Sequence, residues 1–82
     1  MDLVSLTEEL VKAVALHKDS VSVKEFETEN ENEMLIEVMI DQDDMGRVIG
    51  KSGKTANAIR TLVQASSFLG DNKHVRINIE SF

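Results

Sequence analysis

Two runs of alternating apolar and polar residues, 34–40 and 73–80, constrain the fold of this chain most strongly. In the second run, Val75, Ile77 and Ile79 alternate with polar residues, which predicts a β-strand with one buried face. The first run, MLIEVMI, alternates in the same way. More than thirty residues separate the runs. A helical connection of that length allows the two strands to pair in parallel.

Helical periodicity occupies much of the remaining chain. Apolar residues recur every three or four positions in 3–17 and again in 54–69, so both segments are predicted to be helices. Gly70 supplies a stop signal after the second of them. The predicted buried stripes are Leu3, Leu6, Leu10, Val11 and Val14 in the first helix, and Ala56, Ile59, Leu62, Val63, Ala65 and Ser66 in the second.

Three shorter segments complete the pattern. Residues 21–28 alternate as a strand does, although Phe26 is out of phase and indicates a bulge or an early strand end. The polar run 29–33 predicts a turn between two strands. Residues 41–44 offer carboxylate caps for a short helix over 45–50.

These elements follow the order α-β-β-α-α-β, which favours an α+β fold with a three-stranded sheet backed on one face by three helices. We expect one domain over residues 1–82. Without cysteine the chain has no disulfide or thiolate zinc site, and its two histidines, His17 and His74, are far apart in sequence. We therefore expect no metal and no cofactor, and self-association remains the common way to stabilise so small a core.

The chain also lacks the signals that direct proteins to membranes. Its first residues, Met1-Asp2-Leu3, do not resemble a signal peptide, and apolar runs such as 34–36 are far too short to span a bilayer. We expect a soluble protein without membrane insertion. The absence of cysteine fits a reducing cytoplasm.

Charge is divided unevenly along the sequence. The formal net charge is −6, yet residues 45–76 hold six Lys or Arg against Asp71 alone. Residues 1–44 hold three Lys against thirteen Asp or Glu. Such asymmetry favours a local anionic ligand over a globally basic binder, although uneven charge on a small surface also arises by chance.

The segment GRVIGKSGK, residues 46–54, concentrates glycine and cations. Gly50 and Gly53 bracket Lys51 and Ser52, and glycine permits positive φ and close approach of another backbone. The amides of this loop precede the helix predicted from residue 54. A helix N-terminus presents free N–H groups and a positive dipole end, which suits phosphate.

Residues flanking the loop extend this site. Arg47 and Lys54 add cations, while Val48 and Ile49 offer an apolar floor for a base. A backbone clamp beside an apolar surface suits single-stranded nucleic acid.

Two alternatives compete for the glycine loop. Gly50 and Gly53 would also serve as a plain turn between packed helices. A P-loop, G-x-x-x-x-G-K-[ST], is disfavoured because only three residues separate Gly46 from Gly50, the preceding segment is helical, and the chain is too short for a nucleotide hydrolase.

The segment VIGKSGKTANAI, residues 48–59, resembles the V-I-G-x-x-G signature of KH domains. The wider run MGRVIGKSGKTANAIRTLVQASS, residues 45–67, is similar to the small bacterial single-domain KH proteins of the KhpA (YlqC) family. The element order is that of the type II, prokaryotic KH fold. The resemblance implies that the G-x-x-G loop grips about four single-stranded nucleotides, with the bases in an apolar groove between the two central helices and the sheet.

The resemblance also implies site residues and partners. Such a protein binds single-stranded RNA weakly and with little sequence preference, as a homodimer or with a larger KH-containing protein of the KhpB type, in post-transcriptional regulation or RNA chaperoning. The implied RNA-binding set is Gly50, Lys51, Ser52 and Gly53 as the clamp, Arg47 and Lys54 as phosphate contacts, Val48 and Ile49 as groove or core residues, and Asn57 and Arg76 as further contacts.

An enzyme is not predicted. Asp41, Asp43 and Asp44 lack a nucleophile–base pair or metal constellation, and we expect them to act as caps and to be solvated. We expect His17 to place a favourable charge at a helix C-terminus, and His74 to be solvated. The alternative function is a protein-interaction module, in which the KH fold mainly assembles a partner complex through its apolar first helix and its methionines.

Overall fold

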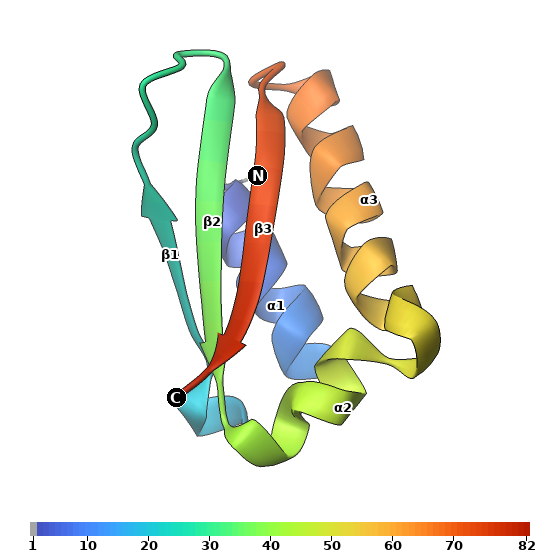
Figure 1. Cartoon of the computed structure of the whole chain (residues 1–82). Coiled ribbons are helices and arrows are strands. Elements are labelled where there is room, and N and C mark those ends of the chain that lie inside the picture. The colour runs from blue at the N-terminus through green and yellow to red at the C-terminus, as the bar shows by residue number, and fades with distance from the viewer. Residues whose placement is uncertain (1) are drawn as a thin grey trace.

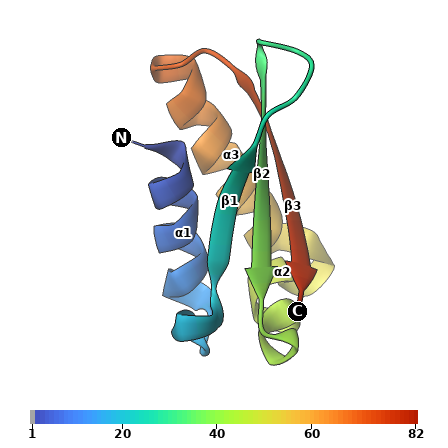
Figure 2. The ribbon, with the colours of Figure 1, turned by 90° about the vertical axis from the view of Figure 1, so that its left-hand side faces the viewer.

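The computed structural model describes residues 2–82 and confirms the order α-β-β-α-α-β (Figure 1). Short 3₁₀ turns occupy Lys18–Ser20, Gln42–Asp44 and Lys51–Gly53. The three helices lie on one face of the sheet, and the other face is open (Figure 2). The helices and strands are α1 (Leu3–Val14), β1 (Ser22–Phe26), β2 (Glu33–Ile40), α2 (Met45–Ile49), α3 (Lys54–Leu69) and β3 (His74–Ser81).

The sheet has the order β1-β2-β3, with β2 at its centre. β1 pairs antiparallel with β2, with Val23 opposite Val38. β2 pairs in parallel with β3, with Ile36 opposite Ile77. The helical connection between β2 and β3 thus joins two parallel strands, as its length allows.

The core lies between the sheet and the helices. Alternation in β2 buries one side chain in two, and Ile36, Val38 and Ile40 are fully buried. The helices contribute one stripe each, because residues three or four apart share a helical face. The buried hydrophobic residues are Leu3, Val11, Ala15, Val23, Met34, Ile36, Val38, Ile40, Val48, Ala56, Ile59, Val63 and Ile77.

The stripe predicted for α3 was wrong in part. Ala56, Ile59, Val63 and Ser67 form its buried row, at steps of three or four residues. Leu62 lies one position before Val63, which turns its side chain about 100° away around the helix, and it is 53% exposed. Ala65 is exposed as well.

Some predicted boundaries also shift. β1 stops at Phe26, so the irregularity there marks an early strand end. α1 ends at Val14, three residues before the predicted end, because the backbone N–H groups of Leu16 and His17 donate to the Asp44 carboxylate and not to helical carbonyls. The Lys18 ammonium donates to the carbonyl of Ala15 at 2.9 Å. Among residues 2–82, no helix is both long and apolar enough to cross a bilayer.

Candidate nucleic-acid interface

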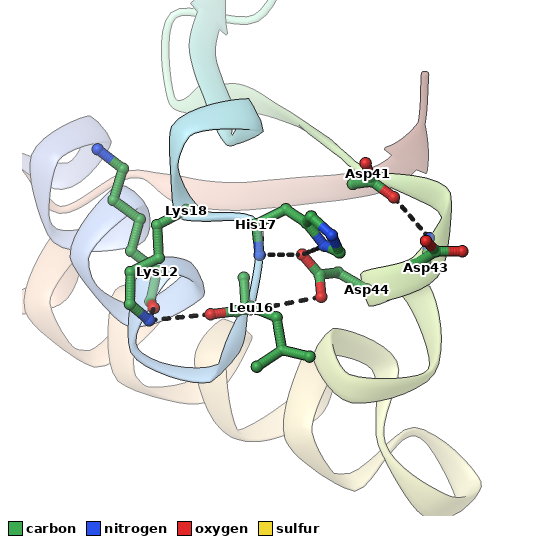
Figure 3. Close-up of polar contacts among 8 residues, drawn as sticks. Lys12, Leu16, His17, Lys18, Asp41, Asp43 and Asp44 are labelled. Atoms are coloured by element: carbon green, nitrogen blue, oxygen red, sulfur yellow. Dashed lines mark hydrogen bonds and ion pairs between the residues drawn. The ribbon is translucent and has the colours of Figure 1, made fainter.

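A buried carboxylate fixes the end of α1 to the start of α2 (Figure 3). Asp44 is 0% exposed, and its oxygens accept the backbone N–H of Leu16 at 3.0 Å and of His17 at 2.8 Å. The His17 Nδ1 lies 3.2 Å from the same carboxylate. The prediction that Asp44 is solvated was therefore wrong. His17 pairs with Asp44, a contact that the sequence analysis did not predict.

Asp44 is held in its charged form by these contacts. Burial raises its pKa, but the hydrogen bonds from the backbone of His17 and Leu16 and from the His17 ring outweigh burial, so the pKa of Asp44 is lowered overall. Because α2 begins at the next residue and leads directly into the glycine loop, this carboxylate helps to set where the loop stands against the rest of the fold.

Gly50 is required by the path of the chain between α2 and α3. Its φ of 77° and ψ of 173° lie in a region that essentially only glycine occupies. A Cβ atom there would clash with the side chain and the backbone nitrogen of Thr55. Gly53 has φ 77° and ψ 12°, and Ser52 also lies in the left-handed region, with φ 57°. The loop is therefore more than a simple turn, because three of its four residues have positive φ.

This conformation leaves backbone hydrogen-bond donors of the loop unpaired. The N–H of Gly53 donates to the carbonyl of Gly50 at 3.2 Å. The N–H groups of Lys51 and Ser52 have no acceptor within residues 2–82. α3 starts immediately afterwards, and its first turn carries no acidic residue. The loop and helix terminus together form a local concentration of positive partial charge.

The cations around the loop are available for an anion. Arg47, Lys51 and Lys54 are exposed, and none of them forms an ion pair in the described part of the chain. Ser52 is exposed between Lys51 and Gly53. The clamp and its two flanking cations thus lie within one short segment of the chain, residues 47–54.

The two apolar residues before the loop have different environments. Val48 is 0% exposed and belongs to the hydrophobic core, so of its two expected roles, groove or core, the structure shows the core role: its side chain holds α2 against the fold. Ile49 is half-buried and keeps part of its surface beside the loop.

Asn57 lies near the loop, whereas Arg76 does not. A Cβ atom on Gly53 would lie 3.7 Å from the Asn57 Nδ2, and the Asn57 Oδ1 accepts a bond from Arg60 at 3.3 Å. Arg76 belongs to the side-chain row of β3 that faces away from the helices, and its Nη2 is 3.8 Å from a Glu33 oxygen. Arg76 is the third residue of β3. The start of β3 is at the end of the sheet opposite the loop between α2 and α3 (Figure 1).

A groove of about 450 Å³ lies between α3 and β3, and the sequence analysis missed it. Gln64 accepts the Val75 N–H at 2.8 Å and donates to the Lys73 carbonyl at 2.9 Å, while Arg60 donates to the Ile77 carbonyl at 3.3 Å. Spacing from Gly53 would have identified the helical wall, because Asn57, Thr61, Gln64 and Phe68 follow at steps of three or four. The lining residues are Arg60, Thr61, Gln64, Ala65, Phe68, His74 and Val75.

One cluster of side chains has the donor types of a metal site. Ligand atoms of His17, Asp41 and Asp43 lie within 4.8 Å of one another. Two of these residues have structural roles, since Asp41 accepts the Asp43 N–H at 2.8 Å and the His17 ring bonds Asp44 (Figure 3). Asp41 thus acts as a cap, as predicted, for the 3₁₀ turn Gln42–Asp44 that precedes α2.

Comparison with known sequences gives a consistent assignment. The family model for the KH domain of KhpA/KhpB matches residues 4–79. The RNA-binding protein KhpA of Leifsonia xyli is 43% identical over 70 residues, which cover 85% of this chain and 86% of the relative. KhpA of Thermotoga maritima is 31% identical over 74 residues, covering 90% and 93% of the two chains.

Solved structures agree on the fold. A crystal structure of an Aquifex aeolicus Era variant bound to GDP·AlF4⁻ matches 98% of this chain with a TM-score of 0.73 at 18% identity. Era in complex with MgGDPNP and nucleotides 1506–1542 of 16S ribosomal RNA matches 96% with a TM-score of 0.69 at 19% identity. The chain spans only 30% and 29% of the two Era chains.

Proposed function

This chain belongs to the KhpA/KhpB family of KH domains, and we propose that it is an RNA-binding protein that grips single strands at the Gly50–Gly53 loop. The observation that carries the proposal is the loop itself. Two backbone N–H groups without acceptors in residues 2–82 belong to the same short segment as three cations without ion pairs there, on a chain whose net charge is −6. An anionic backbone satisfies both features at once.

In this proposal the residues have distinct roles. The N–H groups of Lys51 and Ser52 hydrogen-bond phosphate oxygens, and Gly50 and Gly53 let the strand approach the loop closely. Arg47 and Lys54 neutralise neighbouring phosphates. Ile49 and Asn57 contact the bases, which continue along the groove between α3 and β3. Arg76, on the open face of the sheet, is outside this site.

The activity we propose is binding and not catalysis, in the cytoplasm, by a single KH domain over residues 1–82. The loop makes few phosphate contacts, so affinity is low, and backbone contacts carry no sequence information. A second copy, or a larger KH partner of the KhpB type, would raise avidity through effective concentration. Such a pair suits post-transcriptional regulation or RNA chaperoning.

A second candidate function is assembly of a partner complex. Leu16, Leu62 and Leu69 are 65%, 53% and 90% exposed, which is apolar surface that a protein partner would cover. On this alternative, RNA contact is secondary.

An NMR titration with a short single-stranded RNA, at low and then physiological salt, tests the proposal. We expect shifts centred on residues 46–57 that weaken with salt. The double variant Lys51→Asp/Ser52→Asp is expected to lose them while keeping its oligomeric mass. Lys24→Asp, on the open face of the sheet, is the control for added negative charge and is expected to bind as before. Absence of shifts at millimolar RNA and low salt would reject autonomous RNA binding and favour the assembly function.

A further inference from the structure

The aromatic side chains of this protein lie on its surface. The chain has three Phe and no Tyr or Trp. Phe26, Phe68 and Phe82 are 46%, 59% and 69% exposed, and none of them belongs to the core. Phenylalanine gains much of its stabilising effect by burial, so each exposed ring is a candidate contact for a ligand.

Phe68 differs from the other two in its surroundings. It lines the groove between α3 and β3 together with Arg60, Gln64 and His74, and no residue lining that groove is acidic. The sixteen residues of α3 contain no Asp or Glu, although the chain has fifteen of them. Phe26 and Phe82 instead line a hollow of about 200 Å³ on the open sheet face beside Glu37.

An aromatic ring in a groove without carboxylates and beside the Arg60 guanidinium has the composition of a stacking site for nucleic acid. Proteins that bind single strands combine a positively charged groove with aromatic side chains on which bases stack. A cationic peptide would be repelled by a groove of this charge, and a neutral peptide would bind equally well if α3 carried carboxylates. The charge pattern therefore favours an anionic occupant, and the exposed aromatic ring favours RNA among anions because its bases can stack on the ring.

The helix that forms one wall of this groove begins at the glycine loop. Gly53 directly precedes α3, and Phe68 is close to the far end of this helix. At about 1.5 Å per residue, the fifteen steps between them span about 22 Å. This is about six nucleotides at the 3.4 Å rise of a duplex strand, and fewer in a more extended strand. A strand held at the loop therefore reaches Phe68 at about its fourth to sixth nucleotide.

We propose that Phe68 is a stacking platform for one RNA base, at the end of the groove remote from the glycine loop. This inference rests on the proposed function, because the strand must first be held at Gly50–Gly53. Phe68 thus adds a contact beyond the clamp and makes affinity depend on strand length.

The absence of Trp provides a direct optical test. Phe68→Trp introduces the only indole of the chain, and an RNA base stacked on it quenches its fluorescence. We expect saturable quenching with an octauridylate and much less with a dinucleotide that occupies only the clamp. Phe82→Trp is the matched control, because this position is similarly exposed but lies on the open sheet face. Equal responses of the two indoles would overturn the proposal.

Affinity measurements separate stacking from apolar contact. Alanine substitution of stacking aromatics weakens binding by roughly 5- to 150-fold. We expect Phe68→Leu to lose at least about fivefold for octauridylate, while Phe68→Tyr and Phe82→Leu bind as the wild type does. Wild-type affinity in Phe68→Leu would overturn the stacking role, and the loop clamp would stand. If Phe68→Leu changed the oligomeric mass and left RNA affinity intact, Phe68 would be assigned to a contact between copies and the proposal rejected.

Failure of the proposed function gives a different result. In that case the wild-type chain shows no RNA binding at any strand length, and Phe68→Trp shows no quenching. If the clamp alone is correct, wild-type affinity is lost in Lys51→Asp/Ser52→Asp and is unchanged in Phe68→Leu.

Discussion

The backbone N–H of His17 donates to the carboxylate of Asp44 at 2.8 Å, across 27 positions of sequence. Leu16 donates to the other oxygen of the same carboxylate at 3.0 Å. One buried anion therefore satisfies two donors just beyond the end of α1 and stands immediately before α2. A loop that must present its amides in a fixed direction depends on such distant anchoring, because α2 has only five residues of its own.

Replacement of Asp44 by Asn is expected to destabilise the fold at neutral pH. The amide keeps one acceptor but turns an N–H₂ group toward a backbone donor, which leaves a buried polar group unpaired. Thermal unfolding followed by circular dichroism measures the change. Asp43→Asn, at an exposed neighbouring position, serves as the control and is expected to unfold near the wild-type temperature. Equal melting temperatures for Asp44→Asn and the wild type would contradict the anchoring role.

The lowered pKa of Asp44 also predicts a pH dependence with a definite sign. A carboxyl whose pKa is lower in the folded than in the unfolded state stabilises the fold above its unfolded pKa, about 3.9 for Asp. That contribution disappears as the pH falls through the lower, folded pKa. We therefore expect the gap in melting temperature between the wild type and Asp44→Asn to narrow below about pH 4. A gap that stays constant from neutral pH to pH 2 would argue against an ionised Asp44 in the fold.

Gly50→Ala is expected to reduce the free energy of unfolding by roughly 2–4 kcal/mol, because the new Cβ meets Thr55 and the backbone conformation is unfavourable for alanine. Chemical denaturation measures this loss. Gly46→Ala is the matched control, since a Cβ there has nothing within 4 Å and the position lies inside α2. Alanine is favoured over glycine in helices, so this control is expected to gain up to about 1 kcal/mol.

Val48→Ala is expected to lower the free energy of unfolding by about 2 kcal/mol, because it removes buried methyl groups and leaves a cavity. RNA affinity, measured well below the melting temperature, is expected to be unchanged. Ile49→Ala is expected to lose less stability than Val48→Ala and to bind RNA more weakly than the wild type. A Val48→Ala protein with normal stability but impaired RNA binding would show that Val48 contacts RNA.

Salt is expected to weaken RNA binding in a simple logarithmic way. With three or four phosphate contacts, the slope of log affinity against log salt concentration is roughly −2 to −3 for a single strand. Lys54→Ala should make the slope shallower by about 0.7, whereas Lys24→Ala should leave it unchanged. Fluorescence anisotropy with a labelled oligonucleotide provides the measurement, and a salt-independent affinity would exclude the phosphate clamp.

The sequence predicted those features that repeat locally. Alternation defined β2 and β3, three- and four-residue periodicity defined α1 and α3, and the length of the connection allowed the parallel pairing that the structure shows. The glycine spacing predicted the loop that carries the candidate site. These are properties of single segments, so a single sequence contains them.

Features formed by segments far apart in sequence were missed or misplaced. Nothing in the sequence near Asp44 indicates that its carboxylate is buried or that it accepts the N–H groups of Leu16 and His17. Arg76 lies apart from the glycine loop, and its alternation in β3 shows only that its side chain points away from the core. Leu62 was placed in the core because it is apolar and follows Ile59 by three residues. Its neighbour Val63 takes the buried position, and Leu62 points to a different side of the helix.

The hydrogen bonds from α3 to β3 have a further consequence, at the outer edge of the sheet. A free strand edge exposes unpaired N–H and C=O groups on which a foreign strand can add, as in domain swapping and amyloid growth. Gln64 and Arg60 already occupy the edge groups of Lys73, Val75 and Ile77. The opposite edge strand, β1, has only five residues and carries exposed charges. This small sheet is thereby protected against growth by strand addition on both sides, even though one of those sides also lines an open groove.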